Sequence, residues 1–170
     1  MFVATATQIA YADAPWTSWT DVSLDGSPHD VRDVVTRPNG VLIAAANDGV
    51  FQSADNGVTF TEIPGAPPQS LSVVDGGDVL LLGTRDGLWS FDGTWNRVLD
   101  AVFVEDVLVQ GDLWLAATIG GVRLSRDRGA TWESVPGLDD RFPFHFAIDG
   151  DGSLLVGTKG SGLYRTAMPN

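Results

Sequence analysis

Residues 41–63 read VLIAAANDGVFQSADNGVTFTEI, an apolar segment followed by a short turn ending in Gly49 and then by a second apolar segment. Two runs of β-branched and apolar residues on either side of a short turn predict a β-hairpin. Three other segments share the pattern: VLLLGTRDGLWSFDGTWNRV (79–98), LWLAATIGGVRLSRDRGATWESV (113–135) and LLVGTKGSGLYRT (154–166). The chain is therefore a repeat protein.

The spacing of the repeats indicates the size of the repeated unit. The glycine that ends the turn recurs at intervals of 34 to 41 residues, as Gly49, Gly87, Gly121 and Gly162. Such a period is typical of one four-stranded blade of a β-propeller. The first strand of each hairpin is apolar on both faces, as expected for a strand buried between two neighbouring blades.

Each hairpin is preceded by a further predicted strand, so a complete repeat holds four strands, labelled A to D. The predicted A strands are Asp30–Thr36, Ser70–Asp75, Val102–Val109 and Phe144–Ile148. The N-terminal copy lacks an A strand and has Gln8 near the turn glycine, and the C-terminal copy stops before strand D. The sequence predicts one all-β domain over residues 1–170, with repeats at about 1–27, 28–65, 66–99, 100–137 and 138–170.

The incomplete terminal repeats leave the closure of the propeller open. We favour five blades, of which the first and the last have three strands. One alternative is a four-bladed ring in which residues 16–24 complete the last blade and residues 1–14 form an arm. Another is an arc that a second copy of the chain completes. Unpaired sheet edges tend to associate, so the incomplete terminal blades favour self-association.

Two repeats carry a second motif in the turn between strands C and D, which reads S-x-D-x-G-x-T-(F/W). The Asp is expected to accept hydrogen bonds from nearby backbone N–H groups, and the Gly permits a positive φ. The aromatic ring can pack between adjacent sheets. A shortened version occupies residues 90–95, where Asp92-Gly93 predicts a two-residue hairpin turn.

These turns resemble the Asp-box, or BNR repeat, of sialidase-like propellers, sortilin-type receptors and photosystem-assembly factors. The resemblance is strong at residues 53–60 and 125–132 and, in its period, extends over essentially the whole chain. In that family the motif is structural and lies on the propeller edge away from the usual ligand face. The resemblance therefore implies a structural role, and no metal, for Ser53, Asp55, Gly57, Thr59, Phe60, Ser125, Asp127, Gly129, Thr131 and Trp132.

Composition excludes several classes of function. With 22 acidic and 10 basic residues the net charge is −12, and there is no basic patch of the kind that binds nucleic acid. The absence of cysteine excludes disulfides and thiolate metal sites. No apolar run approaches the roughly 20 residues that cross a bilayer. Residues 2–14 lack the basic start of a signal peptide, which slightly favours the cytoplasm. No cofactor is expected.

No catalytic constellation stands out. Sialidases combine an arginine triad with a Tyr–Glu pair and an Asp, but both tyrosines lie in predicted C strands, and Glu62 and Glu133 lie in D strands. His29 and His145 have no evident partner at a spacing that suits a metal site or a nucleophile relay. Residues 149–153, DGDGS, are predicted to form an A–B turn and not a calcium loop.

Candidate binding residues come from the B–C and D–A loops, where propellers usually meet their ligands and where a rigid scaffold tends to carry function. They are Asp48, Arg85, Asp86, Arg141 and Lys159, and the three basic residues stand out because bases are rare in this chain. The short loops suit a flat face for a protein or a glycan. The expected function is a non-catalytic binding or assembly module. The alternative is a carbohydrate-active enzyme with a carboxylate pair.

Overall fold

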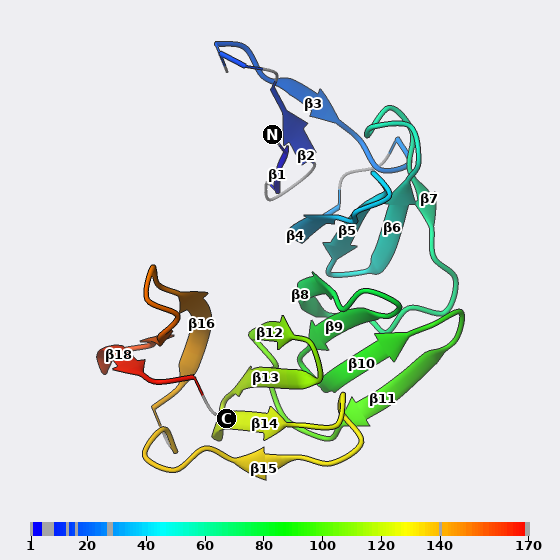
Figure 1. Cartoon of the computed structure of the whole chain (residues 1–170). Coiled ribbons are helices and arrows are strands. Elements are labelled where there is room, and N and C mark those ends of the chain that lie inside the picture. The colour runs from blue at the N-terminus through cyan, green and yellow to red at the C-terminus, as the bar shows by residue number, and fades with distance from the viewer. Residues whose placement is uncertain are drawn as a thin grey trace.

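The computed structural model describes residues 2–4, 9–12, 14–15, 17–26, 29–139 and 141–168 (Figure 1). These residues form strands and turns and no helix, and hence no helix that could span a membrane. The strands are β1 (Phe2–Ala4), β2 (Ile9–Tyr11), β3 (Thr20–Val22), β4 (Val31–Thr36), β5 (Leu42–Ala46), β6 (Gly49–Ser53), β7 (Thr61–Glu62), β8 (Ser70–Asp75), β9 (Leu80–Thr84), β10 (Gly87–Phe91), β11 (Trp95–Leu99), β12 (Asp106–Gln110), β13 (Leu113–Thr118), β14 (Gly121–Ser125), β15 (Glu133–Ser134), β16 (Pro143–Ile148), β17 (Leu154–Thr158) and β18 (Gly162–Thr166).

The strands pair into five antiparallel sheets, numbered here in chain order (Figure 1). Sheet 1 holds β1 to β3, sheet 5 holds β16 to β18, and sheets 2, 3 and 4 hold four strands each. Within every sheet, strands that are consecutive in the chain are neighbours in space. The predicted all-β fold, with three-stranded first and last units, is confirmed.

The sheets follow one another around an arc, with sheet 1 at one end and sheet 5 at the other (Figure 1). Among the described residues the two terminal sheets do not pair, so the ring is not closed by strand pairing. The four-bladed alternative is wrong, because Thr20–Val22 pairs with β2 in sheet 1 and does not complete the last sheet. Gln8 and Trp16, which the sequence places in the N-terminal copy, lie outside the described residues.

The core lies between neighbouring sheets, because each sheet buries one face against the next. Ile43 and Val50 of sheet 2, for example, share a cluster with Val73 and Leu82 of sheet 3. Every residue of β5 and of β9 is buried. Such a strand stacks against a sheet on each side, which explains why the second strand of each repeat is apolar throughout.

Two local predictions need correction. Strand β12 begins at Asp106 and not at Val102, because the N–H of Phe103 (φ 52°) donates to the carbonyl of Arg85 in the preceding sheet, at 3.0 Å. The turn at Asp92 contains three residues and not two, since Phe91 pairs with Trp95. This turn is still shorter than the two Asp-box turns. The strand that follows it, β11, therefore extends to five residues, whereas β7 and β15, which follow the Asp-box turns, contain two each.

Candidate functional site

The first Asp-box turn is closed by the carboxylate of Asp55. One oxygen accepts the N–H of Thr59 at 2.9 Å, and the other accepts the Thr59 hydroxyl at 2.6 Å. The Ser53 hydroxyl donates to Asp55 at 2.7 Å and accepts the N–H of Gly57 at 2.8 Å. Gly57 has a φ of 84°, in the left-handed region that glycine favours. The polar groups of the motif are thus engaged within the turn itself.

The second Asp-box turn repeats this geometry. Asp127 accepts the N–H and the hydroxyl of Thr131 at 2.8 and 2.6 Å, and Ser125 accepts the N–H of Gly129 at 2.7 Å. The indole N–H of Trp132 donates to the carbonyl of Val98 in sheet 3 at 2.9 Å. The motif therefore closes its own turn and ties sheet 4 to sheet 3. Within the described ranges, no three His, Cys, Asp or Glu side chains gather as metal ligands.

The Asp-box carboxylates are expected to make stability depend on pH in acid. The hydroxyl and N–H of Thr59 and the hydroxyl of Ser53 lower the pKa of Asp55 to about 2, and the matching groups around Asp127 lower its pKa as well. A lowered pKa in the folded state stabilises the fold above the unfolded value of about 3.9, and this stabilisation is lost as the pH falls towards 2.

Asp55→Asn is therefore expected to lower the melting temperature at pH 7 and to leave it close to that of the wild type at about pH 2. Thermal melts across this range measure the difference. Asp92→Asn is the matched control, because in the shorter turn the carboxylate accepts only two long bonds of 3.3 and 3.4 Å from Thr94. An Asp55→Asn penalty that stayed constant from pH 7 to pH 2 would contradict this account.

The B–C turns and the D–A loops are joined by backbone hydrogen bonds into one surface, which we call the loop face. The N–H of Phe103 donates to Arg85, that of Ile119 to Val102 (3.2 Å) and that of Lys159 to Phe142 (3.0 Å). Three non-glycine residues of the D–A loops have positive φ values, namely Gln69 (63°), Phe103 (52°) and Phe142 (47°). Side chains tolerate this backbone region poorly, so the surrounding hydrogen bonds must hold these residues in place.

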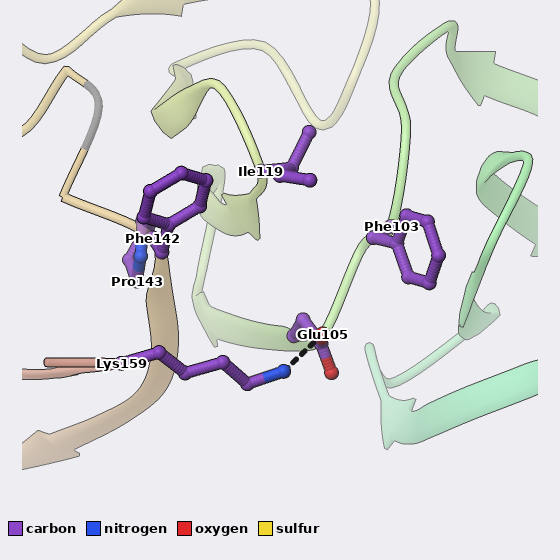
Figure 2. Close-up of a pocket in the computed structure, with 6 residues that line it drawn as sticks. All are labelled: Phe103, Glu105, Ile119, Phe142, Pro143 and Lys159. Carbon is purple, nitrogen blue, oxygen red and sulfur yellow. Dashed lines mark hydrogen bonds and ion pairs between the residues drawn. The ribbon is translucent and has the colours of Figure 1, made fainter.

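An apolar pocket of about 160 Å³ opens on the loop face between sheets 4 and 5 (Figure 2). Figure 2 shows Phe103, Ile119 and Phe142 on three sides of it, with Lys159 extending towards Glu105. Lys159 Nζ lies 2.7 Å from Glu105 Oε1. Ile119 and Phe142 are each 45% exposed, so their apolar surfaces are available to a partner. The pocket therefore offers apolar contacts beside one ion pair.

Each basic candidate lies near an aromatic ring, and Lys159 also lines the pocket. The guanidinium of Arg85 lies 5.4 Å from the centre of the Phe103 ring, and Lys159 Nζ lies 5.7 Å from that of Phe144. Arg141 precedes Phe142 and lies 5.5 Å from the Tyr164 ring. Arg85 and Arg141 form no ion pair within the part of the chain that the structure describes. Both are exposed and able to take an acidic group.

The two acidic candidates have internal partners. Both Asp48 oxygens lie 3.0 Å from Nδ1 of the buried His29, whose Nε2 lies 3.0 Å from Asp25. Burial lowers the pKa of His29, but the hydrogen bonds and charges of Asp48 and Asp25 outweigh burial and raise it. Asp86 pairs with Arg97 at 3.3 Å. His145 also has a carboxylate partner, since its Nδ1 lies 3.0 Å from Asp106, so neither histidine is isolated in the structure.

A second cavity, of about 350 Å³, lies among the inner strands β4, β8, β12 and β16. Asp33 accepts the N–H groups of Val34 and Val73 at 2.8 and 2.9 Å, and thereby links sheet 2 to sheet 3. Asp106 accepts those of Val107 and Phe146 at 2.9 and 2.7 Å and links sheet 4 to sheet 5. Burial raises the pKa of both carboxyls, against the effect of these amide bonds.

The segment 149–153 is an A–B turn, as the sequence predicts. Asp149 accepts the N–H groups of Asp151 and Ser153 at 3.1 Å each. Arg165 bonds to both carboxylates, at 2.8 Å from Asp149 and also to Asp151. Arg165 therefore offsets part of the negative charge of these two carboxylates.

Sequence reasoning missed the apolar residues of the pocket. Phe103 reads as an ordinary residue at the start of a predicted strand, Phe142 directly precedes the predicted strand Phe144–Ile148, and Ile119 reads as part of a short turn. The available signal was the presence of large apolar residues in loops that otherwise hold Gly, Pro and charged residues. Asp33 was missed as well, because its partner Val73 lies in the next repeat.

The sequence matches no protein-family profile. Among curated proteins it is similar to a xyloglucanase of a Paenibacillus species, with 31% identity over 120 residues, which cover 66% of this chain. The match spans only 11% of the length of that protein.

Solved structures with a similar fold include Ycf48 bound to D1 peptide, with a TM-score of 0.75 and 13% identity, covering 99% of this chain and 60% of that one. The GH74 xyloglucanase of Xanthomonas campestris has a TM-score of 0.68 and 19% identity, covering 92% of this chain and 31% of that one. Because both sequence identities are below 20%, the similarity shows a shared fold only.

Proposed function

Because the chain is a β-propeller protein built of Asp-box repeats, we propose that it is a non-catalytic module whose loop face binds a peptide or an exposed protein segment. The pocket between Phe103, Ile119 and Phe142 takes an apolar side chain of that segment. Lys159, which lines the pocket, and Arg85, which lies over the Phe103 ring, take an acidic group next to it.

The observation that carries this proposal is an exposed apolar pocket on a backbone that is already fixed. Sites that are formed before binding lose little conformational entropy when the partner arrives, and exposed aromatic residues beside arginine are typical of binding hot spots. Phe103 and Phe142 hold strained φ values that backbone hydrogen bonds support. The likeness to a propeller bound to a peptide adds support, since it concerns the same fold.

Selection from a phage-displayed random peptide library tests the proposal. Enriched sequences are expected to place a large apolar residue next to Asp or Glu. Phe142→Ala and Ile119→Ala are expected to weaken the binding of a selected peptide about tenfold or more, as removal of a hot-spot contact does. Fluorescence anisotropy with the synthetic peptide measures the dissociation constants.

Val58→Ala is the control, because Val58 is 75% exposed but lies on an Asp-box turn outside the pocket. Equal weakening by Val58→Ala and Ile119→Ala would contradict the proposed site. A selection that enriches no sequence above background would contradict peptide binding itself.

Glycoside hydrolysis is a second candidate, favoured by two carboxyls with raised pKa values, Asp33 and Asp106, at one cavity. Hydrolases use such pairs as acid and base. Both carboxylates already accept two backbone amides each, which favours a structural role for them. If the wild type released reducing sugar from xyloglucan and Asp106→Asn did not, hydrolysis would be established. If the wild type released none, binding would remain as the proposed function.

A further inference from the structure

A further cavity, of about 380 Å³, borders the loop face between sheets 3 and 4. Its walls include the D–A loop 100–102, the B–C turn 119–120 and the side chain of Arg123 on β14. Ile119 also lines the apolar pocket between sheets 4 and 5 (Figure 2). The two cavities are therefore neighbours on the loop face and share Ile119 as a wall.

Arg123 places a half-buried positive charge in this cavity. Arg85, Arg123 and Arg141 are the basic residues that form no ion pair within the described ranges. Arg85 and Arg141 are exposed and lie over aromatic rings, whereas Arg123 is partly buried. Withdrawing a charge from water without a counter-charge is unfavourable. An anion that reaches Arg123 is therefore bound more strongly than it would be at an exposed arginine.

The guanidinium of Arg123 is held in place and keeps donors for a ligand. Arg123 lies opposite Ser134 of β15, and its Nη1 donates to the Ser134 hydroxyl, which is its one hydrogen-bond partner in the part of the chain that the structure describes. Its Nη2 lies beside the B–C turn, since a Cβ added at Gly120 would be 3.7 Å from it. A guanidinium has five N–H donors in a planar fork that matches a carboxylate.

The other residues of the cavity leave this charge unpaired and add an apolar wall. Asp100 lines the cavity, but its carboxylate lies 2.8 Å from Arg97 Nη2. Val102 is 55% exposed, and the Trp132 indole is fixed by its hydrogen bond to the carbonyl of Val98. An apolar wall beside one unpaired guanidinium fits the side chain of Asp or Glu, whose carboxylate forms charge-assisted hydrogen bonds with arginine.

We propose that Arg123 binds a carboxylate of the same partner segment whose apolar side chain enters the pocket at Phe103, Ile119 and Phe142. This inference rests on the proposed peptide binding and adds a second acidic position to it, because neither Lys159 nor Arg85 lines the cavity of Arg123. In an extended segment, alternate side chains point the same way and lie about 7 Å apart. The segment is therefore expected to cross Ile119 with its apolar residue on one side and Asp or Glu on the other.

A double-mutant cycle between protein and peptide tests this pairing. The probe is a fluorescent peptide selected by phage display on the wild type, made also with each Asp or Glu replaced singly by Asn or Gln. Arg123→Met keeps a long side chain without its charge. It is expected to raise the dissociation constant of the original peptide about tenfold, as loss of a hydrogen bond between charged groups does. At one acidic position, the neutral peptide is expected to bind the wild type and Arg123→Met equally.

Arg126→Met is the matched control, because it removes the same charge from the turn after β14, where Arg126 pairs with Glu133 and lines neither cavity. It is expected to leave the dissociation constant unchanged, and circular dichroism shows whether both variants fold. If Arg123→Met bound the original peptide as tightly as the wild type while Phe142→Ala still weakened it, the carboxylate site would be overturned and peptide binding would stand.

A second outcome would overturn the site as well, namely equal weakening by Arg123→Met for the original and for every neutral peptide, since that would indicate a purely structural role. If the selection enriched no sequence, or if Phe142→Ala left the binding of the selected peptide unchanged, the proposed function and this inference would fall together.

Discussion

Gly83→Val is expected to destabilise the protein by about 3 kcal/mol or more, at the upper end of what overpacking a buried site costs. A Cβ at this position would lie 2.4 Å from the Ser72 hydroxyl and 2.5 Å from the carbonyl oxygen of Val104. The second atom belongs to the backbone of the next sheet and cannot turn aside. Relief of the clash therefore requires sheets 3 and 4 to move apart, which exposes the apolar cluster between them.

Gly157→Val is the matched control for this prediction and is expected to change the free energy of unfolding by less than about 1 kcal/mol. It occupies the equivalent position in sheet 5, where no following sheet approaches. Urea unfolding of both variants measures the two free energies of unfolding. Equal destabilisation at the two positions would contradict the account of how the sheets stack.

Gly129→Ala is expected to destabilise the protein by about 2 to 5 kcal/mol, through two effects that add. The residue has a φ of 87°, which costs an L-residue roughly 1–2 kcal/mol. A Cβ there would also lie 2.7 Å from the Trp114 ring, which is buried, so overpacking contributes a further 1–3 kcal/mol, roughly. The Asp-box turn is thus pressed against the core of its own sheet.

Gly93→Ala separates the two effects, because Gly93 has a φ of 116° but no atom within 4 Å of an added Cβ. It is expected to show the backbone cost alone, about 1–2 kcal/mol. Thermal and urea unfolding measure both variants. If Gly93→Ala were as destabilising as Gly129→Ala, contact with Trp114 would contribute nothing and the packing argument would fail.

The strand order could be predicted from the sequence because it depends on local signals. The turn glycines, the apolar second strands and the A–B turn signals repeat within each unit, so each hairpin is defined by its own residues. The start of β12 was predicted incorrectly because Val102 and Phe103 are apolar, as strand residues are, while the hydrogen bond that draws Phe103 away comes from the preceding repeat.

The candidate site was harder to predict from the sequence, because it also depends on contacts between residues that lie far apart in the chain. Arg85, Arg141 and Lys159 could be placed on the loop face because their scarcity in an acidic chain draws attention to them. Asp48 reads as a free acidic residue, but the structure gives it His29 as a partner, 19 residues away. The pocket depends on Phe103 and Phe142 meeting from different repeats at positive φ, which no local pattern encodes.

The most direct test of the central claim is amide chemical-shift mapping of the isotopically labelled protein during titration with a selected peptide. Peptide binding at the loop face predicts progressive shifts at Phe103, Ile119, Phe142 and Lys159, with the Asp-box turns at 53–60 and 125–132 unchanged. Shifts that gather at the Asp-box turns, or along the inner strands around Asp33 and Asp106, with the pocket residues unchanged would contradict it.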